Sequence, residues 1–118
     1  MTSIVDFADS PAAPQPLRPA EDRILAGDPA QSATNHYSDP SGQFHCGIWE
    51  SQPGRWRVRY TEHEVCHILA GRVVITGDDG TRRSYGPGDS FVIPAGFSGE
   101  WEVVEPARKL YGIFEPAA

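Results

Sequence analysis

The sequence is poor in cysteine, in long apolar runs and in positive charge. Its two cysteines, Cys46 and Cys66, are too few for a disulfide framework, which favours a reducing compartment; a single Cys46–Cys66 bridge is the alternative. No apolar run approaches the roughly 18 residues that a membrane helix needs. Residues 1–14 also lack the basic and apolar regions of a secretory signal. We therefore expect a cytoplasmic protein without a membrane partner.

Basic residues are outnumbered, because sixteen acidic residues face ten basic ones and the formal net charge is −6. A net negative surface repels phosphate backbones, so nucleic acid is not an expected partner. Long helices are disfavoured as well, since eleven prolines and twelve glycines in 118 residues favour turns between short strands. A chain of this length supports one domain with one modest core.

The part of the chain before residue 41 differs in texture from the rest. Residues 1–40 are rich in proline, and we interpret them as an irregular N-terminal arm that lies on the domain or on a partner subunit. A disordered tail over about the first fifteen residues is the alternative. Only Ile24 and Leu25 are candidate core residues here, and a short helical turn around them would end at Gly27 and Pro29.

Residues 41–118 carry short apolar runs at close, even spacing, such as RVVITG, SFVIPA and KLYGIF. Runs of this length between turn residues indicate an antiparallel sandwich or barrel. Asp79-Gly80 and Pro53-Gly54 are dipeptides that tight turns favour, because glycine tolerates positive φ and proline presets its own φ. The region is therefore predicted to be a single all-β domain.

The stretch RWRVRY, residues 55–60, alternates most cleanly. Trp56, Val58 and Tyr60 share one face of an extended strand, and the three arginines between them share the other. We expect the aromatic face to be buried and the arginine face to be solvated or paired. Tyr60 is therefore predicted to point into the interior.

Two segments resemble the two sequence motifs of the cupin family. In the first, Glu64 is followed after six residues by Gly71, as in the second half of G-x5-H-x-H-x(3,4)-E-x6-G. In the second, Gly88, Pro94 and Gly96 have the spacing of the first half of G-x5-P-x-G-x2-H-x3-N. A short predicted hairpin lies between the two segments, as it does in the family.

The sequence of residues 60–80 and 85–114 is similar to the small single-domain cupins of the cupin_3 (DUF861) group. That group is related to ureidoglycine aminohydrolase-like and ethanolamine-utilization cupins. The resemblance implies an antiparallel jelly-roll β-barrel of the RmlC-like cupin superfamily, here preceded by the irregular arm. It does not define an activity, because one fold hosts many chemistries.

A metal-binding cupin takes two histidines and a glutamate from the first motif and one histidine from the second. The resemblance places those three histidine positions on Val58, Tyr60 and Gly99. A gap longer by one residue would place the first two on Arg57 and Arg59, but the alternation described above turns the arginines away from the interior.

Of the four implied ligands only Glu64 remains, and one carboxylate does not hold a transition metal against water. We therefore expect no metal cofactor, with a non-standard set built on Glu64, Cys66 and His45 as the alternative. His63 and His67 are four residues apart and lie about 13 Å apart along an extended strand, on the face opposite Glu64. We interpret both as histidines of the rim or outer face.

The candidate catalytic residues are Tyr60, Glu64 and Lys109. Tyr60 and Glu64 face the interior in the favoured register, and Lys109 alternates together with Tyr111 on the last predicted strand. Burial raises the pKa of a glutamate and lowers that of a lysine, while pairing opposes both shifts. Such a pair could anchor a polar ligand or act as general acid and base. A satisfied internal ion pair and a solvent-exposed Lys109 are the alternatives.

The walls of the expected pocket are mostly aromatic and suit a small, partly planar ligand. The predicted lining residues are Trp56, Val58, Cys66, Phe91, Trp101 and Tyr111. Cys66 would be a nucleophile only if a cation stabilised its thiolate, and a buried core cysteine is the preferred interpretation.

Three functions fit these residues. The first is a cupin that binds a small polar metabolite without the usual histidine-based metal site. The second is an enzyme of the family, aminohydrolase-like or isomerase-like, that uses Glu64 with a non-standard metal set or with metal-free acid–base catalysis. The third is a non-catalytic accessory subunit. A homodimer is expected in each case, because Val65 and Leu69 place apolar groups opposite Cys66 and Ile68 and need cover.

Overall fold

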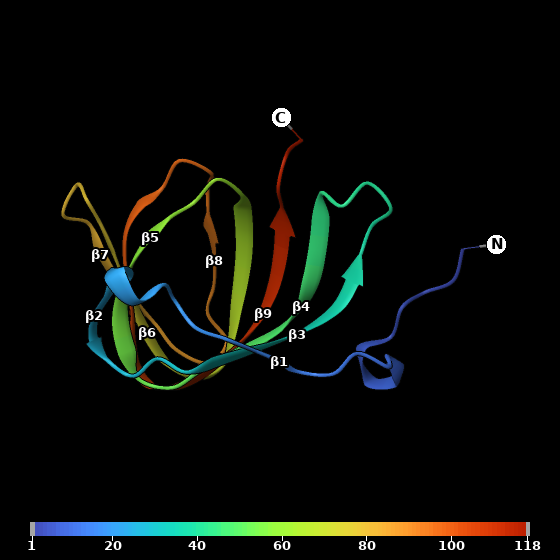
Figure 1. Ribbon diagram of the computed structural model, residues 1–118, viewed down its shortest axis with the longest axis horizontal. Coiled ribbons are helices and arrows are strands. Elements are labelled where there is room, and N and C mark those ends of the chain that lie inside the picture. The colour runs from blue at the N-terminus through green and yellow to red at the C-terminus, as the bar shows by residue number, and fades with distance from the viewer. Residues whose placement is uncertain (1, 118) are drawn as a thin grey trace.

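This computed structural model describes residues 2–117, which contain nine strands and two 3-10 turns. The strands are β1 (Gln15–Leu17), β2 (Ile24–Gly27), β3 (Gln31–Ser38), β4 (Phe44–Ser51), β5 (Gly54–Arg59), β6 (His63–Gly77), β7 (Arg82–Tyr85), β8 (Ser90–Ile93) and β9 (Ser98–Phe114). The turns are η1 (Phe7–Asp9) and η2 (Glu21–Arg23). The predicted all-β class is confirmed (Figure 1). No helix in this part of the chain has the length and apolar character to cross a membrane.

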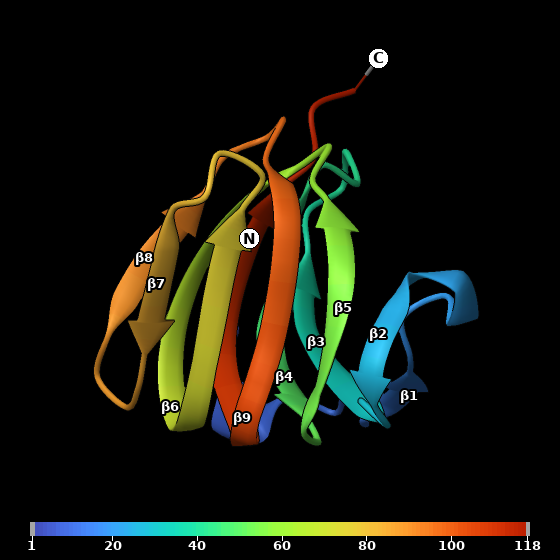
Figure 2. The same cartoon turned by 90° about the vertical axis from the view of Figure 1, so that its left-hand side faces the viewer.

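The strands form one curled antiparallel sheet in which β9 is the central strand. The order along the main path is β1-β3-β4-β9-β5-β2, and β6 pairs with β7, β8 and β9. β9 is long enough to pair with β5 along its first half and with β4 along its second half, while β6 follows it almost throughout. Figure 2 shows β6 and β9 side by side with the other strands curving away from them. The curl gives the sheet one concave face.

The core lies on the concave face because burial alternates along the strands. In β6 the side chains of Cys66 and Ile68 are fully buried, whereas Val65 before them and Leu69 after them are exposed. Residues two apart point to the same face of a strand, so this alternation turns one side of β6 inward. Aromatic rings fill much of the interior, and Trp101 is the largest fully buried side chain.

The alternation predicted for residues 55–60 is confirmed. Trp56 and Tyr60 are buried on the concave side. On the other face, Arg55 Nη1 lies 2.8 Å from Glu100 Oε1 and Arg57 Nη1 lies 2.9 Å from Asp78 Oδ1. The arginine face is therefore paired as well as partly solvated.

The sheet reaches further toward the N-terminus than the sequence analysis expected. Residues 15–38, interpreted there as irregular, contribute β1, β2 and β3, and β3 pairs with β4 along its whole length. The signal was missing because the inner side of QSATNHYS is polar or small, so apolar and polar residues do not alternate. The expected turn is present as η2, but Leu25 is 44% exposed and is not a core residue.

A bend in β6 explains the glycine at the end of the first cupin motif. The pairing of β6 with β9 shifts register around Ala70–Arg72, and Gly71 there has a φ of 83°. A Cβ atom at Gly71 would also overlap the carbonyl oxygen of Pro106 on β9. Only glycine combines positive φ with so close an approach between strands.

We expect Gly71→Ala to lower the free energy of unfolding by about 3 kcal/mol or more, since backbone strain adds to the overlap with Pro106. The matched control is Gly80→Ala. Gly80 has a φ of 88° but open space around it, so only strain of about 1–2 kcal/mol is expected there. Urea unfolding of both variants measures the difference, and equal losses would show that the close approach at Gly71 is unimportant.

Candidate functional site

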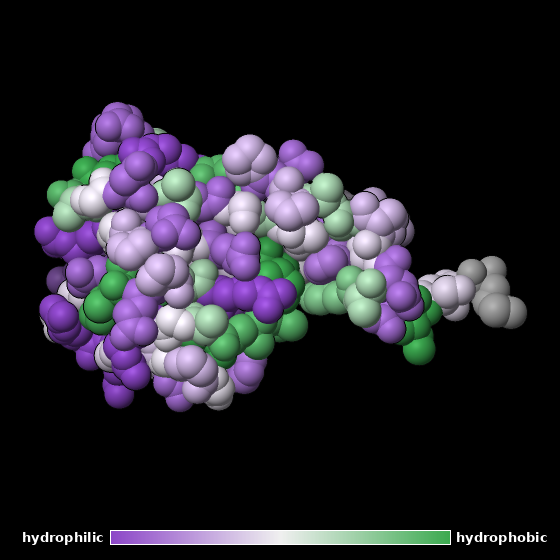
Figure 3. All heavy atoms as spheres, turned by 90° about the horizontal axis from the view of Figure 1, so that it is seen from below, coloured by the Kyte–Doolittle hydropathy of each residue, from purple (hydrophilic) through white to green (hydrophobic). Residues whose placement is uncertain are grey.

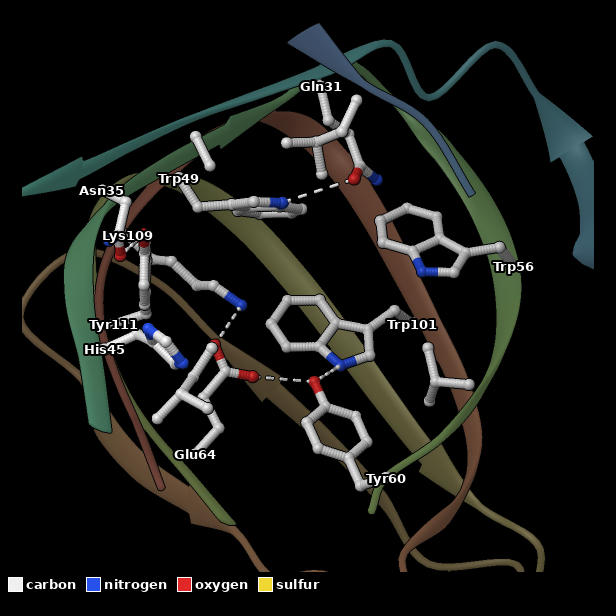
Figure 4. A pocket seen from close by; sticks show the side chains of 14 residues that line it. Gln31, Asn35, His45, Trp49, Trp56, Tyr60, Glu64, Trp101, Lys109 and Tyr111 are labelled. Carbon is white, nitrogen blue, oxygen red and sulfur yellow. Dashed lines mark hydrogen bonds and ion pairs between the residues drawn. The ribbon is translucent and has the colours of Figure 1, made fainter. Parts of the chain in front are cut away.

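The concave face encloses a cavity of about 390 Å³, a size typical of small-molecule sites, which span roughly 300–1,000 Å³. Three tryptophan rings form much of its wall, from Trp49 on β4, Trp56 on β5 and Trp101 on β9 (Figure 4). The polar lining residues are Gln31, Asn35, His45, Tyr60, Glu64, Lys109 and Tyr111, and the apolar ones are Leu17, Ala33, Val58 and Ile113.

A buried ion pair lies at the polar end of the cavity. Glu64 Oε2 is 2.9 Å from Lys109 Nζ, and both side chains are only 6% exposed. Lys109 on β9 lies opposite Ile68 rather than Glu64 on β6. Ile68 is four residue steps from Glu64, which corresponds to about 13 Å along the strand. The lysine and glutamate side chains extend toward each other along the inner face and meet at 2.9 Å, so the pair ties β6 to β9 within the cavity.

Tyr60 and Trp101 complete the hydrogen bonding of Glu64. The Tyr60 hydroxyl donates to Glu64 Oε1 at 2.9 Å and accepts a hydrogen bond from Trp101 Nε1 at 3.0 Å. Both carboxylate oxygens therefore have a partner, and the phenol both donates and accepts. A buried polar network that is satisfied in this way stabilises one arrangement of its members.

Lys109 is held in its charged form. Burial is the largest single influence and lowers the pKa of this lysine, but the negative charge of Glu64, together with the hydrogen bonding to Glu64 and the contribution of Cys66, leaves the pKa raised. The ammonium also lies over the rings of Trp49 and Trp101, 4.4 Å and 4.2 Å from their centroids. Such cation–π contacts favour the charged form in a site with little water. Lys109 therefore does not supply a neutral amine near neutral pH.

Tyr60 and Cys66 stay protonated at neutral pH. Burial, with the negative charge of Glu64 added, raises the pKa of Tyr60 well above its ordinary value. Burial also raises the pKa of the Cys66 thiol to about 12, although Lys109 opposes the shift. A thiol of this kind is a poor nucleophile, because the thiolate is the reactive form. The preferred interpretation of Cys66 as a core residue agrees with this environment.

The residues present do not fit a transition metal. Val58 and Tyr60 lie on the inner face where a metal-binding cupin has histidines, and neither Val58 nor a protonated phenol is a suitable ligand. Any side chain at Gly99 would overlap the carbonyl oxygen of Thr76, so this position cannot take the third histidine without a backbone shift. Between residues 2 and 117, no three His, Cys, Asp or Glu side chains are grouped closely enough to hold an ion.

The remaining histidines lie away from the ion pair. His63 and His67 are on the outer face of β6, where His67 Nδ1 is 2.6 Å from Ser90 Oγ and His63 stacks on Phe114. This placement confirms the interpretation of both as outer-face or rim residues. His45 does line the cavity, but its two ring nitrogens contact Ser38 and Gly42.

The structure brings together most of the side chains that the sequence singled out. Tyr60, Glu64 and Lys109 form one network, and Trp56, Val58, Trp101 and Tyr111 line the same cavity. Their functional roles stay predictions.

Two of the predicted pocket residues do not reach this cavity. Cys66 is fully buried behind its wall. Phe91 stacks on Tyr85, with centroids 3.9 Å apart, and lines a separate hollow under β7 and β8. The correct face of β8 was predicted for Phe91, but β8 lies on the far side of β6 from β9.

Three polar or aromatic residues of the site were missed, namely Gln31, Asn35 and Trp49, and His45 was considered only for the alternative metal set. The inward direction of Trp49 could have been predicted from its strand. The charged Glu50 faces outward together with Cys46 and Ile48, and Trp49 has the opposite parity and therefore faces inward. Gln31 and Asn35 carry no such signal, since they belong to the polar strand β3.

The fold and this cavity define a cupin-type β-barrel whose interior is centred on an ion pair. The chain belongs to the Cupin_3 family, described as the EutQ-like cupin domain, whose family model matches residues 38–111. The cupin_3 (DUF861) resemblance of the sequence is thereby confirmed. A comparison with curated proteins finds no match.

Solved structures with the same fold include a DUF861-family protein of unknown function from Pseudomonas syringae pv. tomato, with 23% identity and a TM-score of 0.79. That alignment covers 89% of this chain and 46% of the other, so this chain spans about half of its length. The EutQ protein of Clostridium difficile is 20% identical with a TM-score of 0.66, over 84% of this chain and 74% of that one. A DUF861-family protein from Thermotoga maritima is 37% identical with a TM-score of 0.55, over 57% of this chain and 76% of that one.

The raised pKa values predict a protein that loses stability at high pH. Burial raises the pKa of Cys66 and of Tyr111 to about 12 each, so the unfolded chain releases these protons at a lower pH than the folded chain does. The stabilisation is complete below about pH 9 and is lost as the pH rises toward 12. Lys109, with its raised pKa, acts in the same direction.

Urea unfolding between about pH 9.5 and pH 11 measures this loss, and Cys66→Ala isolates the part that is due to the thiol. The variant lowers stability at every pH, but its decline should be shallower by up to about 1.4 kcal/mol per pH unit. Equal slopes for the two proteins would contradict the buried, protonated thiol.

Proposed function

We propose that this protein binds a small, partly planar metabolite in the tryptophan-walled cavity, without a metal ion. The observation that carries the proposal is the buried Glu64–Lys109 pair beside a cavity of about 390 Å³ that side chains leave open. A barrel that served only as a scaffold would gain stability by filling that space, because interiors are normally close-packed.

The protonation states favour binding over catalysis. An effective general acid or base has a pKa near the working pH. Here Tyr60 and Lys109 both have raised pKa values, and the carboxylate of Glu64 already has a partner on each oxygen. The network is therefore better suited to holding one ligand orientation than to moving protons.

An enzyme remains the second candidate, because the cupin_3 group is related to ureidoglycine aminohydrolase-like cupins and Glu64 occupies the glutamate position of the first cupin motif. That finer relation stays a prediction. If the bound metabolite is turned over, Glu64→Gln separates the two functions: it abolishes turnover in an enzyme while the metabolite still binds. Absence of turnover by the unchanged protein would leave binding, or the accessory role, as the function.

The binding proposal is tested by mass spectrometry of whatever small molecule co-purifies with the untagged protein. Ala33→Phe places a ring in the cavity without touching the ion pair, and we expect the bound molecule to fall to background levels. Ser32→Phe on the same strand points the other way and should retain it. Equal recovery from both variants would place the ligand elsewhere, and none from the unchanged protein would favour the accessory role.

We also propose that the chain works as a homodimer in the cytoplasm. Four large apolar side chains are exposed on the outer face of β6, β8 and β9: Val65, Val92, Leu110 and Phe114, at 44%, 61%, 36% and 47%. Val65 lies directly opposite Val92 on β8 and Gly112 on β9, so its cross-strand neighbours are both uncharged. The free cysteines, on opposite faces of the sheet, support a reducing compartment.

The N-terminal arm supports the same proposal. Residues 2–14 project from the barrel (Figures 1 and 3), and Ile4 and Val5 on the arm are 96% and 43% exposed. Figure 3 shows hydrophobic spheres on this projection. A second copy of the chain would cover apolar groups that its own barrel leaves in water.

We expect Val65→Asp to convert the dimer to a monomer, because a carboxylate in the middle of an apolar interface loses its hydration without a partner. Val104→Asp is the control, since Val104 is 46% exposed on a part of β9 that lies away from Val65. Light scattering gives the mass of each variant. A monomeric unchanged protein, or a dimer that survives Val65→Asp, would refute this interface.

A further inference from the structure

The acceptors of the cavity are already used by the protein. Glu64 accepts from Tyr60 and contacts Lys109, as described above. Asn35 Oδ1 accepts a hydrogen bond from the Tyr111 hydroxyl at 2.8 Å, and Gln31 Oε1 accepts one from Trp49 Nε1 at 3.3 Å. A ligand that offers only donors therefore finds few free oxygens on this wall.

Some hydrogen-bond donors of the cavity, in contrast, have no partner. Gln31 Nε2 is buried and has no hydrogen-bond partner within residues 2–117. The orientation of this amide is fixed, because an indole N–H only donates and Trp49 must therefore face the amide oxygen. The side chain of Trp56 also lines the cavity, and its indole N–H makes no hydrogen bond to the described residues, although this nitrogen is not among the buried unpaired atoms. A buried donor without a partner is costly, so an acceptor on a ligand would be stabilised here.

The cavity carries no net charge. Glu64 and Lys109 compensate each other at 2.9 Å. Both ring nitrogens of His45 already have partners in the protein: Nε2 donates to the carbonyl oxygen of Gly42 at 3.0 Å, and Nδ1 lies 2.7 Å from Ser38 Oγ. A charged ligand group would lose its hydration without finding an uncompensated opposite charge, which is unfavourable.

We propose that the part of the ligand that enters the cavity is an uncharged, flat ring system bearing a hydrogen-bond acceptor of the carbonyl type. The acceptor lies at Gln31 Nε2 or Trp56 Nε1, and the ring lies against the tryptophan faces. This inference rests on the proposed binding function and narrows its ligand class. Gln31 would then be a specificity-determining residue, because its free Nε2 donor selects ligands that carry an acceptor.

Four probes of the same shape test the class: 2-acetylnaphthalene, 2-ethylnaphthalene, naphthalene-2-carboxylate and 2-naphthylmethylammonium. We expect the ketone to bind about tenfold more tightly than either charged probe, because an unpaired charge is costly to bury. It should also bind about fivefold more tightly than the ethyl compound, which has no acceptor. Ligand-observed NMR titrations of the full chain give the four dissociation constants.

Gln31→Glu is the matched variant, since it replaces the free Nε2 donor by an acceptor while leaving an oxygen for Trp49. We expect it to weaken binding of the ketone about fivefold or more, and Gln52→Glu on the exposed surface to leave it unchanged. Gln31→Leu, which adds no charge, gives the same loss if the donor is responsible.

The outcomes separate the two proposals. If a charged probe binds as tightly as the ketone, or both Gln31 variants bind the ketone normally, the ligand class is wrong. Should Ala33→Phe still abolish that binding, the cavity remains the binding site and the proposed function stands. If Ala33→Phe abolishes the binding of none of the four probes, or if no probe binds at all, the proposed function fails together with the ligand class.

Discussion

The buried contact between the Glu64 carboxylate and the Lys109 ammonium is the constraint on which the inside of this barrel depends. Loss of one partner from such a pair leaves a lone buried charge, at a cost of about 3–5 kcal/mol. The two long strands that carry the pair, β6 and β9, must therefore keep one register. Tyr60, which directly follows β5, and Trp101 on β9 extend the contact by two hydrogen bonds, which gives the aromatic interior a single polar centre.

This arrangement separates the protein from metal-binding members of its fold. The carboxylate that would help to hold an ion is compensated by a lysine, and close approach of the strands at Gly99 leaves no room for a histidine. The ammonium in turn is held between the rings of Trp49 and Trp101. What remains open is a cavity with aromatic walls and unpaired donors, and the proposed binding function rests on these features.

Most of the barrel, and about half of the cavity, could be predicted from residue patterns. Where a strand has one apolar and one charged face, as in RWRVRY, alternation alone assigns each side chain correctly. The same reasoning failed for the polar strand QSATNHYS, because its inner side faces a cavity rather than a packed core. Phe91 shows a second limit: its face was predictable, but not its distance from the cavity across the curled sheet.

The sequence by itself determined the all-β class, the inward direction of Tyr60 and Glu64, and the absence of the histidines that a cupin metal site requires. These properties are local, since they depend on parity along a strand and on residue identity at motif positions. Only the tertiary structure decided that Lys109 meets Glu64, that β3 closes the cavity with Gln31, and that the donor of Gln31 is left unpaired. Those properties depend on strand order, register and curvature, which bring together residues far apart in the chain.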